Sequence, residues 1–352
     1  DDEQLNRPLL EMKGLRIEGL SETGWQEIVR GVNLHLKRGE ILGLIGESGA
    51  GKSTIGLAAM GYARDGCRIT EGDILFDGIE LSSAPENEKR KLRGTRISYV
   101  AQSAAAAFNP VHRLLDQFAE GPIEHGVMSR TEAMEKGRAL YRSLDLPDPE
   151  NIGERWAHQV SGGQLQRMMV AMAMSCGPDL IIFDEPTTAL DVTTQIEVLK
   201  TIKEIVNNSN VAALYITHDL AVVAQLADHL MVLRHGNLVE VNSTGQILEA
   251  PKEDYTRALL DARTRHEKTA VQISDAETLL SINSVTAGYG NGSDILQEVS
   301  VSVERGRTVA VVGESGSGKS TLARVITGLL PQRSGEIHFQ SESLPSALAQ
   351  RS

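Results

Sequence analysis

The sequence predicts an α/β protein that contains one complete domain and a partial second copy of it. A phrase of nine residues occurs twice, as GESGAGKST at 46–54 and as GESGSGKST at 313–321. In both copies an apolar segment typical of a strand precedes the phrase, and a helical segment follows it. With 352 residues, 41% of them hydrophobic, the chain is long enough to bury two cores.

The similarity between the copies extends upstream of the phrase without gaps, from Ile28 in the first and Ile295 in the second. Each copy has an alternating strand, an Arg-Gly turn and a short apolar strand before the phrase, and the strand-like segments GDILFDG and GEIHFQS after it. Repetition over this length marks two homologous domains in tandem. We expect a first domain over 8–262, a polar linker over 263–278 and a second domain over 279–352.

The second domain is expected to be truncated. The first copy continues from its phrase to about residue 262, whereas only residues 322–352 follow the second phrase. A parallel α/β domain cannot close its core over so short a segment. Residues 279–352 are therefore expected to be the N-terminal part of a domain.

The composition disfavours several classes of protein. A net charge of −12 repels a phosphate backbone, so nucleic acid is not an expected partner. Cys67 and Cys176 lack the spacing of metal ligands and are typical of a reducing compartment. No apolar run approaches the roughly 20 residues that cross a bilayer, so we expect any membrane association to come through a partner.

Both phrases fit the pattern G-x-x-x-x-G-K-[ST], in which glycines let the backbone N–H groups turn toward a phosphate. Lys52 is expected to reach the β- and γ-phosphates, and the hydroxyl of Ser53 to contact Mg²⁺. The predicted ATP-binding residues of the first copy are Gly46, Glu47, Ser48, Gly49, Ala50, Gly51, Lys52, Ser53 and Thr54. Those of the second are Gly313, Glu314, Ser315, Gly316, Ser317, Gly318, Lys319, Ser320 and Thr321, with Ser320 as its metal ligand.

A pair of carboxylates, Asp184 and Glu185, ends the apolar segment LIIFDEP. At the end of a strand beside the phosphate loop, Asp184 is expected to hold Mg²⁺ and Glu185 to polarise the attacking water as general base. Taken alone, the pair could instead begin a turn before Pro186. The preceding motif VSGGQ at 160–164 opens a helical segment, where free N–H groups form an anion site or simply a capped helix.

The motifs VSGGQ, LIIFDEP, TTALD and ITHD, taken together, resemble the nucleotide-binding domain of ATP-binding cassette (ABC) proteins. The resemblance implies a P-loop NTPase fold, with a RecA-like core, an antiparallel β-subdomain and a helical subdomain at about 103–175. It also implies that Ser161, Gly162, Gly163 and Gln164 bind the γ-phosphate of an ATP that the partner domain holds.

The same resemblance implies further roles. Asp191 matches the loop aspartate that links the two ATP sites, and His218 matches the histidine that contacts the γ-phosphate and the attacking water. Gln102, after the segment ISYVA, matches the glutamine that reaches the metal and the water. Trp25 and, in the second copy, Tyr289 are the candidates for stacking on adenine, although Trp25 could instead be a packing residue.

Two further segments, AAFNPVHRLLDQ and GQILEAPKEDYTRALLDA, resemble the ATPases of peptide, nickel and opine importers. The residues that carry this likeness are Asn109, Pro110, Pro251, Tyr255, Thr256, Arg257, Leu259 and Leu260. The resemblance implies a fused, tandem ATP-binding subunit whose two domains pair with each other, with ATP and Mg²⁺ as cofactors. It further implies two membrane permease subunits, an extracytoplasmic solute-binding protein and a peripheral location at the cytoplasmic face of the inner membrane.

A soluble tandem ABC ATPase that acts in translation or DNA repair is the alternative. Such proteins usually join their cassettes with a long, charged helical linker and lack the Tyr-Thr-Arg tail. The short linker and the acidic charge of this chain favour the importer.

Overall fold

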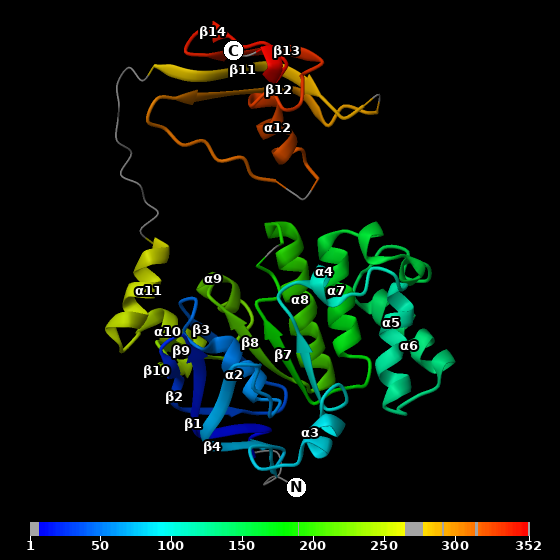
Figure 1. Cartoon of the computed structure of the whole chain (residues 1–352), viewed down its shortest axis with the longest axis vertical. Coiled ribbons are helices and arrows are strands. Elements are labelled where there is room, and N and C mark those ends of the chain that lie inside the picture. The colour runs from blue at the N-terminus through cyan, green and yellow to red at the C-terminus, as the bar shows by residue number, and fades with distance from the viewer. Residues whose placement is uncertain (1–6, 189, 265–276, 291, 314–315, 351–352) are drawn as a thin grey trace. The chain divides into compact units, whose positions relative to one another are not determined.

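The computed structural model describes residues 7–188, 190–264, 277–290, 292–313 and 316–350. These residues form two compact units, and the second consists largely of the described residues from 277 onward. The first unit ends with helix α11 (Asp254–Thr264), and the second begins with strand β11 (Thr278–Ala287) (Figure 1). Most of the expected linker, residues 265–276, lies outside the described residues.

A six-stranded sheet in the order β10-β9-β3-β8-β7-β6 is the centre of the first unit. Its strands are β3 (Ile41–Gly46), β6 (Ile97–Val100), β7 (Leu180–Asp184), β8 (Ala212–Thr217), β9 (His229–Arg234) and β10 (Asn237–Ser243). All are parallel except β10, which pairs antiparallel with β9 at one edge. The loop after β3 therefore opens at the same edge of the sheet as the ends of β7 and β8, which brings the predicted motifs together.

The two faces of this sheet are buried in different cores. Along β7, Ile181 and Phe183 face one core, whereas Leu180 and Ile182 face the other, because successive side chains of a strand alternate. The second core is closed by α2 (Lys52–Ala58) and by an antiparallel sheet in the order β2-β1-β4-β5. That sheet consists of β1 (Leu10–Ser21), β2 (Gly24–Leu36), β4 (Cys67–Phe76) and β5 (Ile79–Glu80), and α3 (Glu86–Leu92) follows it.

A group of helices lies beside the edge strand β6 (Figure 1). It comprises α4 (Ala104–Ala107), α5 (Leu114–Glu124), α6 (Arg130–Ser143), the short 3₁₀ helices at Ile152–Glu154 and Ala157–Gln159, and α7 (Gly162–Ala173). The other helices are α8 (Val192–Ser209), α9 (Leu220–Val223) and α10 (Thr244–Glu249). The predicted fold class, with its α/β core, antiparallel subdomain and helical subdomain, is confirmed for the first unit. No helix within the described ranges has the length and apolar character needed to cross a lipid bilayer.

The second unit has one antiparallel sheet in the order β12-β11-β13-β14 and one α-helix among its described residues. Its further elements are β12 (Leu296–Glu304), α12 (Lys319–Ile326), β13 (Ser334–Phe339), β14 (Glu342–Ser343) and a 3₁₀ turn at Leu348–Gln350. The segment GEIHF forms β13, as predicted.

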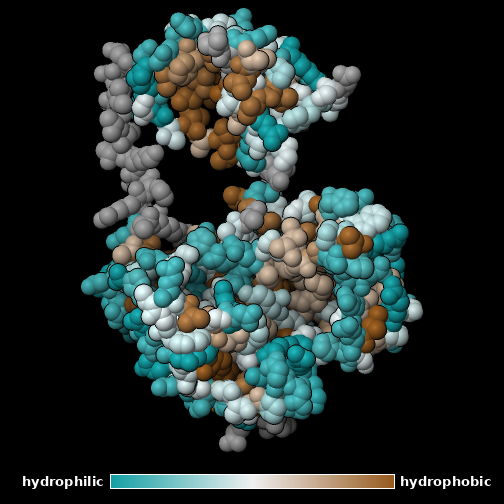
Figure 2. Space-filling model, viewed as in Figure 1, coloured by the Kyte–Doolittle hydropathy of each residue, from teal (hydrophilic) through white to brown (hydrophobic). Residues whose placement is uncertain are grey.

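The prediction of a strand before the second phosphate loop is wrong. Residues 307–312 form no strand, and Val311 and Val312 are 51% and 86% exposed. In the first unit the matching strand β3 is buried because β8 and β9 flank it. Among the described residues of the second unit no such parallel neighbours occur, so the segment has nothing to pair with. Figure 2 shows hydrophobic residues on the surface of this unit.

Candidate functional site

The loop after β3 has the backbone of an anion-binding turn. Gly49 and Gly51 have φ values of 81° and 93°, in the left-handed region that favours glycine. Gly46 is required for a different reason, since a Cβ there would lie 2.2 Å from the carbonyl oxygen of Leu233 on β9. Backbone of this kind presents successive N–H groups to an anion, and α2 begins directly after it.

Lys52 holds the two ends of this loop together. Its Nζ donates to the carbonyl oxygens of Gly46 at 2.8 Å and Glu47 at 2.9 Å. Burial lowers the pKa of Lys52, and the nearby charges of Glu185 and Asp184 only partly oppose this effect. A buried ammonium group at the start of α2, held by the loop carbonyls, is well placed to receive a phosphate.

The candidate metal ligands Ser53 and Asp184 are in contact. The Oγ of Ser53 donates to Oδ1 of Asp184 at 2.9 Å, although 131 residues separate them in the chain. Within the described ranges no group of three or more His, Cys, Asp or Glu residues could hold a metal. One hydroxyl and one carboxylate still fit Mg²⁺, which usually takes one or two protein ligands and completes its shell with phosphate oxygens and water.

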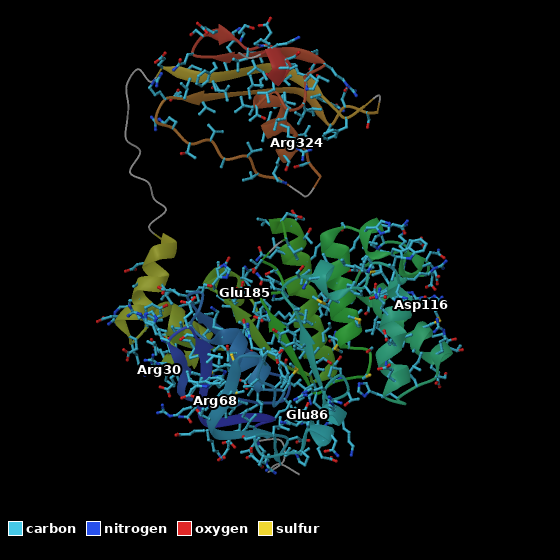
Figure 3. All side chains as sticks on the ribbon, viewed as in Figure 1. Arg30, Arg68, Glu86, Asp116, Glu185 and Arg324 are labelled. Atoms are coloured by element: carbon cyan, nitrogen blue, oxygen red, sulfur yellow. The ribbon has the colours of Figure 1, made fainter. Side chains whose placement is uncertain are left out.

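Glu185 and His218 also meet, although they follow different strands. Nδ1 of His218 lies 3.1 Å from Oε1 of Glu185, and Thr188 donates to Oε2 at 3.1 Å. The backbone of Glu185 has φ 48°, a conformation that costs roughly 1–2 kcal/mol for a residue other than glycine. Its N–H donates to the carbonyl of Ile216 on β8, which holds this turn in place. Figure 3 labels Glu185 at this edge of the central sheet.

Two pockets flank the loop. The larger, of about 600 Å³, has both Glu185 and His218 in its wall together with Gln102, which follows β6. The smaller, of about 300 Å³, lies over Lys52 and Ser53. Its remaining wall includes Ile28, Arg64 and Cys67, which the sequence analysis did not assign to the nucleotide site because no motif marks them.

Trp25 is part of β2 and does not line either pocket. Trp25 is 42% exposed, and the guanidinium carbon of Arg68 lies 4.0 Å from the centroid of its ring. One face of the indole is therefore occupied by a cation–π contact. Figure 3 labels Arg68 near the antiparallel sheet.

The VSGGQ motif forms a capped helix start. Ser161 Oγ accepts from the N–H of Gln164 at 3.2 Å, and the Gln164 side chain accepts from the N–H of Ser161 at 3.1 Å. Ser161 is exposed, and a Cβ on Gly162 would meet nothing within 4 Å. Neither pocket includes this motif in its wall. Asp191, by comparison, accepts from the N–H and hydroxyl of Thr194 at the start of α8.

The second phosphate loop repeats part of the first. Gly313, Gly316 and Gly318 have φ values of 156°, 84° and 96°, and Lys319 Nζ donates to the Gly313 carbonyl at 2.8 Å. Gly46, Gly49 and Gly51 have nearly the same values. Ser320 and Thr321 follow on α12, whereas Glu314 and Ser315 lie outside the described residues. Tyr289, 44% exposed, accepts a hydrogen bond from Arg324 at 2.9 Å.

Together, the phosphate loop, the carboxylate pair after a buried strand and the serine-capped helix define a nucleotide-binding domain of the ATP-binding cassette type. A family profile described as ABC transporter matches residues 29–188 and 296–352. The chain therefore belongs to the ABC transporter family.

Curated relatives include the glutathione import ATP-binding protein GsiA. The protein from Salmonella paratyphi A is 34% identical over 99% of this chain, and that from Shigella dysenteriae is 33% identical over 96%. The chain spans only 62% and 60% of the length of these two relatives.

Solved structures share the fold. A dimeric ATP-binding cassette in a post-hydrolysis state, bound to ADP and Pi, has a TM-score of 0.60 at 24% identity, covering 67% of this chain and 98% of its own. The cbiO1 protein of Clostridium perfringens, part of the ABC transporter complex cbiONQ, has a TM-score of 0.60 at 21% identity, covering 74% and 98%.

Proposed function

We propose that this chain is the ATP-binding subunit of an ABC importer and hydrolyses ATP to drive the uptake of a small solute. One observation carries the proposal: a buried lysine, a Ser–Asp contact and a Glu–His contact converge where β3, β7 and β8 end. These are the groups needed to bind a triphosphate, hold its metal and activate a water molecule. Membership of the ABC transporter family supports the same function.

Each residue has a proposed role in hydrolysis. Lys52 holds the β- and γ-phosphates as a point charge, and Ser53 and Asp184 hold Mg²⁺. Bound there, Mg²⁺ would neutralise charge on the phosphate oxygens. Glu185 accepts the proton of the attacking water, and His218 orients the Glu185 carboxylate, which it already contacts at 3.1 Å. Gln102, in the wall of the same pocket, is proposed to contact the metal and the water.

The remaining predicted residues are proposed to act across a pair of cassettes. Ser161 and its helix start would bind the γ-phosphate of an ATP held by Lys319 of the second copy. Asp191 would link the two sites, and Trp25 and Tyr289 would stack on adenine. The exposed serine and the open space at Gly162 support this role, because a phosphate could approach the capped helix without a clash.

The solute is proposed to be glutathione or another small peptide. The relatives from Salmonella and Shigella are named for glutathione import, and the Tyr-Thr-Arg tail resembles that of peptide importers. Two permease subunits and an extracytoplasmic binding protein are the proposed partners, which places this chain at the cytoplasmic face of the inner membrane. The predicted alternative, a soluble factor in translation or DNA repair, has no support among these relatives.

Affinity purification from membranes tests the proposal. The chain should co-purify with hydrophobic permease subunits and should bind ATP with Mg²⁺ in calorimetry. Co-purification with ribosomal proteins, or the absence of Mg²⁺-dependent ATP binding, would contradict it. Uptake of radiolabelled glutathione and of radiolabelled dipeptides, measured in cells with and without the gene, would then show which solute is imported.

A further inference from the structure

Asp184 has a second hydrogen-bond partner that the nucleotide-binding motifs do not include. The hydroxyl of Tyr99, on the edge strand β6, donates to Oδ2 of Asp184. The hydroxyl of Ser53 donates to Oδ1, so each oxygen of this carboxylate accepts a hydrogen bond from one hydroxyl. Two donors on opposite oxygens fix the rotation of a carboxylate more firmly than one donor can.

The sheet places these two side chains on one face. Tyr99 pairs with Ile182 in the parallel register of β6 and β7, and Asp184 follows Ile182 by two residues. Side chains two residues apart on a strand share a face, and a diagonal neighbour lies within reach of an aromatic side chain. The face is the one covered by α2, because Ile182 belongs to the core that α2 closes. Tyr99 and Ser53 therefore reach Asp184 from the same core.

The phenol of Tyr99 serves as a donor. A tyrosine hydroxyl carries one O–H that it can donate, and the Oδ2 of Asp184 is its acceptor here. Tyr99 is also one of the residues that line a separate pocket of about 410 Å³, together with residues of α5 and α7.

We propose that Tyr99 is a positioning residue for the metal–nucleotide site, acting through Asp184. It holds the carboxylate with Oδ1 toward Ser53, so that the carboxylate and the serine hydroxyl face the metal together. This inference rests on the proposed function, since it assigns Tyr99 to the same Mg²⁺–ATP site.

The test compares nucleotide binding with and without metal in the whole chain. Tyr99→Phe removes the hydroxyl and keeps the ring. A nonhydrolysable ATP analogue should bind this variant about tenfold more weakly at saturating Mg²⁺, the size expected for one lost hydrogen bond to a charged group. In EDTA its affinity should equal that of the wild type, because Lys52 and the loop are unchanged.

A matched control and a double mutant sharpen the result. Tyr215→Phe removes a hydroxyl from β8 in the same sheet, where the partner is Thr187, and should leave the metal dependence unchanged. In an Asp184→Asn background, Tyr99→Phe should have no further effect on the metal dependence. Equal losses in Mg²⁺ and in EDTA, or an unchanged Mg²⁺ dependence of Tyr99→Phe, would overturn the inference. If the wild type shows no Mg²⁺-dependent binding, the proposed function itself fails.

Discussion

Glu185 and His218 are brought within 3.1 Å of each other by two neighbouring parallel strands. The strands β7 and β8 are parallel neighbours and end at the same edge of the sheet, so the residues that follow them lie close together. Glu185 receives a hydrogen bond from Thr188 as well, which leaves its carboxylate fixed beside the phosphate loop. A fixed carboxylate near the loop is the geometry that a general base needs.

Replacing Glu185 by glutamine should stop turnover and keep nucleotide binding. The amide cannot accept a proton from water, yet its oxygen can still accept the hydrogen bond from Thr188 and its NH₂ group can donate to Nδ1 of His218. The rate of ATP hydrolysis should fall by about 100-fold or more, as expected for the loss of general-base catalysis. The measurement is phosphate release alongside ATP binding, with Glu204→Gln on the exposed face of α8 as control. A wild-type rate in Glu185→Gln would show that another group activates the water.

Replacing Lys52 by alanine should weaken nucleotide binding and loosen the loop. The variant loses the positive charge that is proposed to hold the β- and γ-phosphates. It also loses the two hydrogen bonds to the carbonyl oxygens of Gly46 and Glu47. We expect the ATP affinity at this site to fall at least tenfold, since hydrogen bonds to charged groups contribute about 1.5–3 kcal/mol. Calorimetry measures this change, with the exposed Lys200→Ala as control. Unchanged affinity at this site would contradict the proposed role of the lysine.

The effect of Ser161 on stability can be separated from its proposed effect on ATP hydrolysis, because a second helix has the same kind of cap. Ser161 caps α7 and Ser129 caps α6, and each forms the same reciprocal box with the side chain three residues later. Ser161→Ala and Ser129→Ala should therefore lower the free energy of unfolding by a similar amount, about 1 kcal/mol. Only Ser161→Ala should also reduce ATP hydrolysis by paired cassettes. Equal hydrolysis in the two variants would leave Ser161 with a capping role alone.

Glu240 makes stability depend on pH. It is buried on β10 and accepts from the N–H groups of Lys252 and Glu253 at 3.0 and 3.1 Å. Burial acts to raise the pKa of Glu240, but the hydrogen bonds outweigh it and the net pKa is lowered. The stabilising effect is thus complete above the ordinary pKa of about 4.3 and is lost as the pH falls through the lower, folded-state value.

Thermal unfolding between about pH 6 and pH 3 tests this dependence. In Glu240→Gln the melting temperature should be lower near neutral pH, because the charged acceptor is gone, and it should decline less as the pH falls. Glu249→Gln, on exposed α10, serves as control and should follow the wild type. If the melting temperatures of the wild type and Glu240→Gln fall in parallel with pH, Glu240 is not the source of the pH dependence.

The sequence alone predicted those parts of the site whose signals are local. Lys52 and Ser53 are adjacent in the chain, and the strand, loop and helix around them follow from residues 41–58. Glu185 and His218 were predicted because each directly follows an apolar segment that forms a strand. Their contact requires only that β7 and β8 be neighbours in a parallel sheet.

Other features depend on pairing that no local pattern specifies. Tyr99 was not singled out because its bond to Asp184 follows from the register between β6 and β7. The prediction of an apolar strand before the second phosphate loop was wrong for a related reason. Its apolar sequence matches that of β3, but β3 pairs with the parallel strands β8 and β9, and the described residues of the second unit provide no such neighbours.

Three solvent-exposed valines of the second unit are expected to promote self-association of this protein. Val309, Val311 and Val312 are 43%, 51% and 86% exposed, in a run without charge or proline after Arg307. Such a run is prone to stack with copies of itself in concentrated solution. Light scattering should therefore rise steeply with protein concentration, and Val312→Lys should delay that rise while leaving the first phosphate loop intact.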